Sequence, residues 1–252
     1  MKPKKVNKCI IDADIVAYRS AAGTEGQTQE DTKNKVDVLM NYIVNETVVF
    51  PTEDNLECYL TGSDNFRYDV AKTAPYKGNR KDVPKPSNLP AARAYLQKKW
   101  GSVVSHGEEA DDLIGIAATR NDPETTVVCT IDKDMLQLPC WHFNFVKNEW
   151  KYVGVEDGNK FFYTQILTGD SADNIKGIFR VGPVKAGKIL EGLTTEKQMY
   201  EACLEAYLEV KLDNPDIKYP FEKMAWAEER VLENARLLWL RRYENQMWEP
   251  PK

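Results

Sequence analysis

The segment TTVVCTI (residues 125–131) is followed at once by DKD (residues 132–134). β-branched residues fill most of the first segment, and such residues favour strands. The segment therefore predicts a buried strand, with Asp132 and Asp134 in the loop after its carboxyl end. Open α/β sheets bind ligands outside the carboxyl ends of their strands, so these two carboxylates mark a candidate functional site.

Strands and helices alternate on both sides of this segment. Strands are expected over residues 6–11, 56–61, 102–105, 141–146 and 149–153, and helices over residues 30–49, 89–100, 108–120, 195–210 and 221–243. This order predicts an α/β fold with a central, mainly parallel sheet flanked by helices, followed by a C-terminal helical region. We expect two domains, residues 1–165 with a basic, irregular segment at 65–100, and residues 166–252. The last six residues, MWEPPK, are expected to be frayed.

Acidic residues gather in five short clusters, each placed where a strand ends or a helix begins. The nine carboxylates belong to Asp12, Asp64, Glu109, Asp111, Asp112, Asp132, Asp134, Asp170 and Asp173. If the fold brings them together, their mutual repulsion requires compensating cations. Oxygen ligands in such number favour Mg²⁺ or Mn²⁺ over zinc. A pair of these ions is typical of phosphodiester cleavage.

Each cluster also has an ordinary structural interpretation. Asp12 or Asp14 suits the N-cap of the helix expected next, and Asp14 suits it better. Asp64 lies in a sequence typical of turns. A helix dipole favours one or two acids in the first turn, but the acids within residues 108–112 repel one another. The joint occurrence of the clusters is what favours the metal interpretation.

Positive charge is concentrated in two segments, although the whole chain carries a formal net charge of −5. Residues 67–85 and residues 176–188 each carry a net charge of +4. Basic segments on both sides of an acidic site suit a polyanion such as nucleic acid. Phe66, Tyr68 and Tyr76 interleave the first segment, and we expect them to pack rather than to stack on unpaired bases.

Several classes of protein are excluded. No apolar run approaches the ~18 residues that a membrane-spanning helix requires, and the N-terminus lacks the apolar region of a signal peptide. The five cysteines form no C-x-x-C pair, which favours buried free thiols, and the two histidines are expected to be structural or exposed. G-x-x-x-x-G-K at residues 182–188 is followed by Ile189 instead of the Ser or Thr of a P-loop. We expect a cytoplasmic monomer, in the host cytoplasm if a phage encodes it.

Five stretches resemble the flap endonuclease or 5′-nuclease superfamily, in particular the bacteriophage 5′→3′ exonucleases and the 5′-nuclease domain of bacterial DNA polymerase I. They are IIDAD (10–14), TGSDNFRYDVAKTAPYKGNRK (61–81), EEADDLIG (108–115), CTIDKDMLQL (129–138) and TGDSADNIKGIFRVGPVKAGKIL (168–190). The combination of YKGNR, EADD and GD-x-x-DNI-x-G is highly specific. The chain departs from its relatives at Asp14 and Pro183, and its arch segment is short.

The resemblance implies two divalent ions, Mg²⁺ or Mn²⁺. The first site would use Asp12, Asp64, Glu109 and Asp111, with Asp112 close by, and the second would use Asp132, Asp134, Asp170 and Asp173. Lys77 and Arg80 match the basic pair at the base of the family's helical arch, so the implied catalytic residues are Lys77, Arg80 and Asp112. Residues 174–191 resemble the family's helix–three-turn–helix, with a K⁺ ion as a further expectation. The implied DNA-binding residues are Lys81, Lys176, Gly177, Gly182, Lys185 and Lys188.

The function that the resemblance implies is that of a metal-dependent 5′ nuclease acting on 5′ ends, flaps, nicks and gaps in duplex DNA. It would be a 5′→3′ exonuclease, a flap endonuclease or both, and RNA–DNA hybrids are compatible with it as substrates. Replication proteins are further expected partners. Two alternatives stay open: a catalytically inactive DNA-binding homologue and a ribonuclease of the related PIN type.

Overall fold

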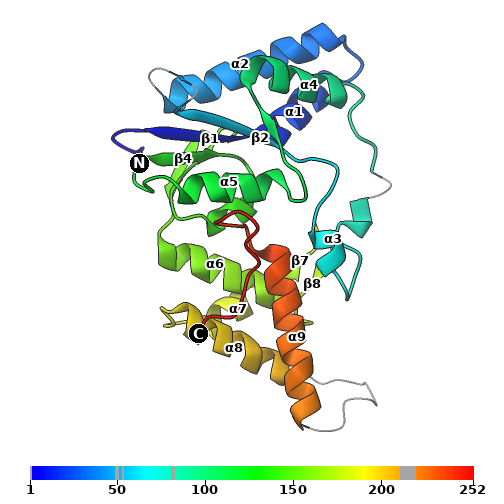
Figure 1. The fold of residues 1–252 in the computed structure, drawn as a ribbon, viewed down its shortest axis with the longest axis vertical. Helices are drawn as coiled ribbons and strands as arrows, with labels where there is room; N and C mark the ends of the chain where they lie inside the picture. The colour runs from blue at the N-terminus through cyan, green and yellow to red at the C-terminus, as the bar shows by residue number, and fades with distance from the viewer. Residues whose placement is uncertain (1, 49–50, 53, 81–82, 211–219) are drawn as a thin grey trace. The chain divides into compact units, whose positions relative to one another are not determined.

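The structure is a computed structural model that describes residues 2–48, 51–52, 54–80, 83–210 and 220–252 (Figure 1). The chain folds into two compact units. Unit 1 comprises Met1–Asn65, Val83–Gly154 and Leu240–Asn245, and unit 2 comprises Phe66–Asp82, Val155–Trp239 and Gln246–Lys252. These units differ from the two expected domains, because each unit takes in a segment that lies far from the rest of it in sequence.

Unit 1 is built on a six-stranded sheet with the order β3-β2-β1-β4-β5-β6. The strands are β1 (Lys8–Asp12), β2 (Leu56–Leu60), β3 (Val103–Val104), β4 (Thr126–Cys129), β5 (Trp141–Asn144) and β6 (Glu149–Tyr152). Neighbouring strands run parallel, except that β6 is antiparallel to β5. The prediction of a mainly parallel sheet is therefore confirmed.

Helices cover both faces of this sheet, as Figure 1 shows. They are α1 (Ala13–Ala22), α2 (Gln29–Thr47) and α4 (Leu89–Trp100) on one face, and α5 (Ala110–Thr119) on the other. Side chains of β1 alternate between the two layers: Cys9 and Ile11 pack with the first three helices, whereas Ile10 packs with α5. Because both faces are covered, β1 is buried along its whole length, as parallel sheets require.

Unit 2 is mainly helical. Its elements are α3 (Arg67–Val70), the 3₁₀ turn η1 (Gly78–Arg80), α6 (Val155–Thr168), the short strands β7 (Gly169–Asp170) and β8 (Ile175–Lys176), α7 (Pro183–Ile189), α8 (Glu196–Leu208) and α9 (Pro220–Leu238). Phe162, Ile166 and Val231 belong to its apolar core. Arg67 is fully buried and donates hydrogen bonds to the carbonyl oxygens of Leu237 and Trp239, both at 2.8 Å. This arginine satisfies the carboxyl end of α9 and holds α3 against it.

Two expectations about the C-terminus are wrong. Helix α9 ends at Leu238 instead of 243, and Leu240–Asn245 belongs to unit 1. The last residues are not frayed, because Trp248 is buried and its carbonyl oxygen accepts a hydrogen bond of 3.2 Å from Arg236. The five cysteines are buried free thiols, as expected. In the described part of the chain, no helix has both the length and the apolar character that crossing a membrane requires.

Candidate active site

The carboxyl ends of β1 and β4 meet at one edge of the sheet in unit 1, because these strands are adjacent and parallel with Ile11 opposite Cys129. The Thr130 hydroxyl donates to Asp12 Oδ2 at 2.8 Å, and it accepts from the Asp132 backbone N–H at 3.0 Å. One hydroxyl therefore joins the end of the first strand to the turn that carries Asp132. We call Asp12, Thr130 and Asp132 the carboxylate junction.

Asp12 is the N-cap of α1, since its Oδ1 accepts from the Ile15 backbone N–H at 3.2 Å. The expectation that Asp14 suits this cap better is therefore wrong. Asp14 lies in the first turn of the helix, where it accepts from the Thr61 backbone N–H at 2.8 Å and forms an ion pair with Arg93. An aspartate at either position could cap the helix. The observed end of β1 at Asp12 shows that Asp12 is the N-cap.

Burial raises the pKa of Asp12 to about 7, from an ordinary value of 3.8. The negative charges of Asp14 and Asp132 raise it further, whereas the hydrogen bonds from Thr130 and Ile15 lower it. Asp12 is only 3% exposed, so water screens this repulsion poorly. A cation at the junction would relieve it, and hard carboxylate oxygens are the ligands that Mg²⁺ and Mn²⁺ prefer.

The turn after β4 is shaped by its own acidic residues. Asp132 is the N-cap of the 3₁₀ helix η2 (Lys133–Gln137), and its Oδ1 accepts from the Asp134 backbone N–H at 2.9 Å. The two carboxylates thus belong to one tight turn, as the sequence predicted. Each is partly exposed, unlike Asp12.

The segment before α5 is tied to the end of β2. The Ala110 backbone N–H donates to the Thr61 hydroxyl at 3.0 Å, and the Gly62 N–H donates to the Ser105 hydroxyl at 3.0 Å. A Cβ atom at Gly62 would lie 2.1 Å from the Ser105 carbonyl oxygen, so the approach requires glycine. This places the acidic start of α5 at the same edge of the sheet as the junction.

Within this acidic segment, Asp112 is part of the local framework. It has no exposed surface, and its side chain accepts from the Glu109 N–H at 3.1 Å and from the Arg241 N–H at 3.2 Å. Asp64 in turn accepts from the Gly107 N–H at 2.8 Å. The catalytic role predicted for Asp112 stays a prediction, and its contacts favour a part in orienting Glu109 over contact with substrate.

The described residues contain no group of three Asp, Glu, His or Cys side chains already gathered closely enough to hold a metal ion. The chemistry of the acidic donors fits a hard divalent cation, but the side chains do not form a closed set of ligands. The metal roles of Asp12, Asp64, Glu109, Asp111, Asp132, Asp134, Asp170 and Asp173 accordingly stay predictions.

In unit 2, Asp173 lies among basic residues. Its carboxylate accepts from the Tyr76 hydroxyl at 2.9 Å, pairs with Arg80 at 2.5 Å and lies 3.7 Å from Lys77 Nζ. We call Tyr76, Lys77, Arg80 and Asp173 the ion-pair cluster. Lys77 and Arg80, which are predicted to bind phosphate, are therefore held by Asp173, which is predicted to bind metal.

Backbone contacts fix this arrangement. The Lys77 N–H donates to the Asp173 carbonyl oxygen at 2.9 Å, and Arg80 Nε donates to the Ala172 carbonyl oxygen at 2.9 Å. Lys77 has a φ of +52°, a left-handed conformation that is uncommon outside glycine. Asp170 is buried, and its Oδ1 accepts from the Ala172 N–H at 2.7 Å. The opposite charges of YKGNR and GDSADN are compatible with an ion pair between the two motifs. The sequence does not show that Asp173 contacts Lys77 and Arg80.

The model of the 5′–3′ exonuclease N-terminal, resolvase-like domain matches residues 7–163. The chain belongs to this 5′–3′ exonuclease family. Flap endonuclease Xni of Shewanella sediminis is 27% identical over 207 residues, covering 76% of this chain and 78% of that protein. DNA polymerase I of Deinococcus radiodurans is 30% identical over 142 residues, covering 51% of this chain but only 15% of the polymerase.

Solved structures show the same fold for this exonuclease-family chain. The 5′-exonuclease of T5 with bound divalent zinc ions has a TM-score of 0.64 at 16% identity, covering 92% of this chain and 89% of that one. The bacteriophage T5 flap endonuclease, in a pseudo-enzyme-product complex with DNA and metal ions, has a TM-score of 0.60 at 16% identity, covering 92% and 88%.

The residues of this exonuclease-family chain that were predicted to bind DNA differ from one another in their surroundings. Lys176, Lys185 and Lys188 are exposed in unit 2, whereas Lys81 lies outside the described residues. Gly177 packs against backbone, since a Cβ atom there would lie 2.2 Å from the carbonyl carbon of Thr168. Close packing within unit 2 therefore explains this glycine, whereas a Cβ atom at Gly182 would meet nothing within 4 Å. Residues 182–188 lie mostly in α7, which agrees with the rejection of a P-loop.

Tyr76 and Tyr68 of the first basic segment have different surroundings. Tyr76 is buried and hydrogen-bonded to Asp173, which agrees with the packing role that we expected. Tyr68 is 57% exposed, with its ring against the edge of Tyr76.

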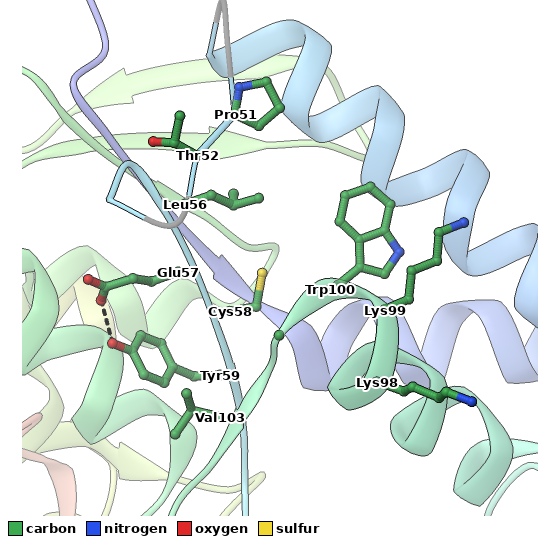
Figure 2. Close-up of a pocket in the computed structure, with 11 residues that line it drawn as sticks. Pro51, Thr52, Leu56, Glu57, Cys58, Tyr59, Lys98, Lys99, Trp100 and Val103 are labelled. Carbon is green, nitrogen blue, oxygen red and sulfur yellow. Dashed lines mark hydrogen bonds between the residues drawn. The ribbon is translucent and has the colours of Figure 1, made fainter.

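Two pockets of unit 1 differ in their relation to the candidate site. A pocket of about 680 Å³ lies along β2 and the end of α4, where Trp100 and Val103 flank Cys58, and none of the predicted site residues lines it (Figure 2). A pocket of about 280 Å³ is lined by Asp132 and Thr130, together with Lys147, Lys151 and His142. Burial lowers the pKa of His142 to about 4, and its Nε2 lies 2.9 Å from the Leu138 carbonyl oxygen. This histidine is therefore neutral and structural at physiological pH, as expected.

Proposed function

We propose that this chain is a structure-specific 5′ nuclease of DNA that requires divalent metal ions. The observation that carries the proposal is the carboxylate junction, where Thr130 brings Asp12 and the Asp132 turn together at the carboxyl ends of parallel strands. Membership in the 5′–3′ exonuclease family supports the same reaction. The products would be a 5′-phosphate and a 3′-hydroxyl.

Metal binding would stabilise the junction as well as serve the reaction. The first ion would be held by Asp12, Asp64, Glu109 and Asp111. The second would be held by Asp132, Asp134, Asp170 and Asp173. Bound ions would activate water and stabilise the leaving oxygen, which is the chemistry that two-ion nucleases use. Burial, together with repulsion from Asp14 and Asp132, raises the pKa of Asp12 and supports this assignment, because a buried carboxylate beside like charges gains most from a cation.

Lys77 and Arg80 would bind a phosphate of the substrate. Asp173 holds both side chains in place, and the left-handed backbone at Lys77 fixes the start of the segment. Lys77 is partly buried, so its charge would act on a phosphate with less screening than a surface lysine. Both residues would offset negative charge that builds on the phosphate oxygens during cleavage.

The exposed cations of residues 176–188 would hold duplex DNA by its backbone, with little sequence preference. We infer that this segment acts as the helix–three-turn–helix, with K⁺ as an additional ligand. The logarithm of the DNA-binding constant should then fall linearly with the logarithm of salt concentration, which anisotropy titrations between low and moderate salt can measure. A flat salt profile would count against the segment as a DNA contact.

The deciding experiment is product mapping on 5′-labelled flap, nicked and single-stranded DNA, with Mg²⁺ and with EDTA. Mg²⁺-dependent cleavage near the flap junction supports the proposal. DNA binding without cleavage would instead identify an inactive homologue. A parallel series with RNA 5′ strands tests activity on RNA–DNA hybrids, and cleavage restricted to single-stranded RNA would identify a PIN-type ribonuclease.

A further inference from the structure

One turn of unit 2 presents an apolar side chain to solvent between two anchored ends. The Val181 N–H donates to the Ile178 carbonyl oxygen at 3.0 Å, and the Ile178 N–H donates to the Leu167 carbonyl oxygen at 2.8 Å. Val181 is buried in the core of the unit, and Ile178 packs against that core. Phe179 and Arg180 lie at the centre of the turn, and Phe179 is 81% exposed.

Both central residues are in unfavourable states. An exposed phenylalanine ring orders water without contributing to the core. Arg180 has a φ of +61°, in the left-handed region where a side chain other than glycine is strained. Core packing does not require either feature, because the neighbours Ile178 and Val181 already fill the interior. Strain and exposure therefore coincide at one anchored turn, and packing of the core explains neither.

The segment that carries the ring is strongly positive. Lys176, Arg180, Lys185 and Lys188 are exposed, and residues 176–188 contain no acid. In the described part of the chain, none of these four side chains forms an ion pair with a carboxylate. The Arg180 guanidinium lies 5.1 Å from the centroid of the Phe179 ring, within cation–π range.

The exposed ring and the positive charge of its segment together favour a nucleic acid as the partner. An exposed aromatic ring with a cation over it, in a segment with three further exposed cations, suits a polyanion with flat apolar groups, which is the chemistry of a nucleic acid with accessible bases. Inside a continuous duplex, each base face is covered by the adjacent stacked base pair. A gap leaves the base faces beside it exposed. We propose that Phe179, oriented by Arg180, stacks on a base face exposed where a DNA duplex is interrupted. The inference rests on the proposed function of the chain and adds a residue that recognises the discontinuity.

The test compares a continuous DNA duplex with one in which a gap exposes base faces. A hairpin-closed duplex and the same duplex with a single-nucleotide gap are titrated in EDTA, so that binding is measured without cleavage. Phe179→Ala should bind the gapped DNA about tenfold more weakly than the wild type, which is the range for loss of one base–aromatic stack. Its affinity for the continuous duplex should stay within about twofold, and its salt slope should not change because no charge is lost.

Three variants sharpen the comparison. Phe179→Trp keeps a stacking ring and should retain affinity for the gapped DNA. Phe221→Ala removes another exposed phenylalanine of unit 2, 70% exposed and next to acidic Glu222, and should bind both DNAs like the wild type. Arg180→Gly relieves the left-handed strain, so it should raise the melting temperature while it weakens binding to the gapped DNA.

Two results would overturn the stacking proposal while leaving the nuclease proposal intact. Phe179→Ala could bind the gapped DNA as tightly as the wild type, or it could lose affinity equally for both DNAs, which would assign the ring to a groove contact. Failure of the wild type to bind either DNA would overturn both proposals. Because Phe179 is exposed, its substitution should leave the fold intact, and circular dichroism of each variant checks this.

Discussion

Asp12 and Asp173 are the same residue type and were given the same predicted role, but their surroundings are opposite. Asp12 is buried beside the like charges of Asp14 and Asp132. Asp173 is in contact with Lys77, Arg80 and the Tyr76 hydroxyl. Among the described residues, one carboxylate therefore lacks a counter-charge in direct contact, and the other already has two.

An acidic cluster in sequence therefore does not define a single electrostatic role. A carboxylate that raises local negative potential favours a cation from solution. A carboxylate held by arginine and lysine instead fixes those cations for an anionic ligand. The carboxylate junction and the ion-pair cluster can therefore be told apart by experiment, because removing a charge has opposite effects on stability in the two places.

The largest expected effect is on cleavage at the carboxylate junction. Asp132→Asn keeps an oxygen that can cap η2, so the turn should persist, but it removes a charge needed to hold the metal. Cleavage of a 5′ flap should fall about thousandfold, equivalent to ~4 kcal/mol of transition-state stabilisation, whereas DNA binding in EDTA should not change. Asp157→Asn, on the exposed start of α6, is the matched control. Wild-type turnover in Asp132→Asn would remove this residue from the metal site.

The next effect is on the pH dependence of stability. Because the folded chain raises the pKa of Asp12 from 3.8 to about 7, the folded state holds a proton that the unfolded state has released between these pH values. The stability contribution is therefore present at low pH and is lost as pH rises from about 4 to 7, by on the order of 4 kcal/mol. Asp12→Asn should lose this slope in urea unfolding in EDTA, and should be more stable than the wild type at pH 8.

His142 also contributes to the pH dependence of stability in this range. Its lowered pKa makes the folded state bind fewer protons than the unfolded state between about 4 and 6.5, so its contribution has the opposite sign. It is present in both proteins, so the difference between wild type and Asp12→Asn isolates Asp12. Mg²⁺ at pH 8 should then stabilise the wild type more than Asp12→Asn. Equal slopes in the two proteins would show that Asp12 carries no unfavourable charge.

Lys77→Ala tests the ion-pair cluster in catalysis. Loss of a partly buried cation should lower the single-turnover cleavage rate about thirtyfold, with an affinity change of about threefold or less, because the charge on the phosphate oxygens builds up during the reaction. Lys72→Ala in the same basic segment is the control, since its contact with Glu233 uses the backbone N–H and not the side chain. A large loss of affinity at a normal single-turnover rate would place Lys77 away from the reacting phosphate.

The smallest expected effect is on the stability of unit 2. Asp173→Asn keeps an acceptor for Tyr76 but leaves Lys77 and Arg80 without their counter-charge. Arg80 is half exposed, so the loss is discounted for solvent and should be about 1 kcal/mol in thermal unfolding. Asp69→Asn, in the exposed first turn of α3, should change nothing. Stabilisation of the protein by Asp173→Asn would contradict the contrast with Asp12.

The sheet was predictable because its signals are local. Apolar runs mark β1, β2 and β4 within about two residues, and the spacing of helices between them requires parallel strands. The Asp132 turn was predictable for the same reason. The boundaries of the units were not, because they depend on contacts such as that of Arg67 with the carboxyl end of α9, 170 residues away in sequence. The composition of the 67–85 segment showed its charge but not that part of it would fold into α3 and η1.

The residue types at the strand ends follow from the amino-acid order alone, and with them the α/β class, the family resemblance and the supply of carboxylates and cations. Which of these charged groups repel one another and which form ion pairs depends on the folded structure. Asp12 and Asp14 are two residues apart in the chain, yet Asp14 pairs with Arg93 of α4 while Asp12 accepts a hydrogen bond from Thr130 of the turn after β4. The physical reason is that electrostatic energy depends on distance and burial in space, which separation along the chain does not encode.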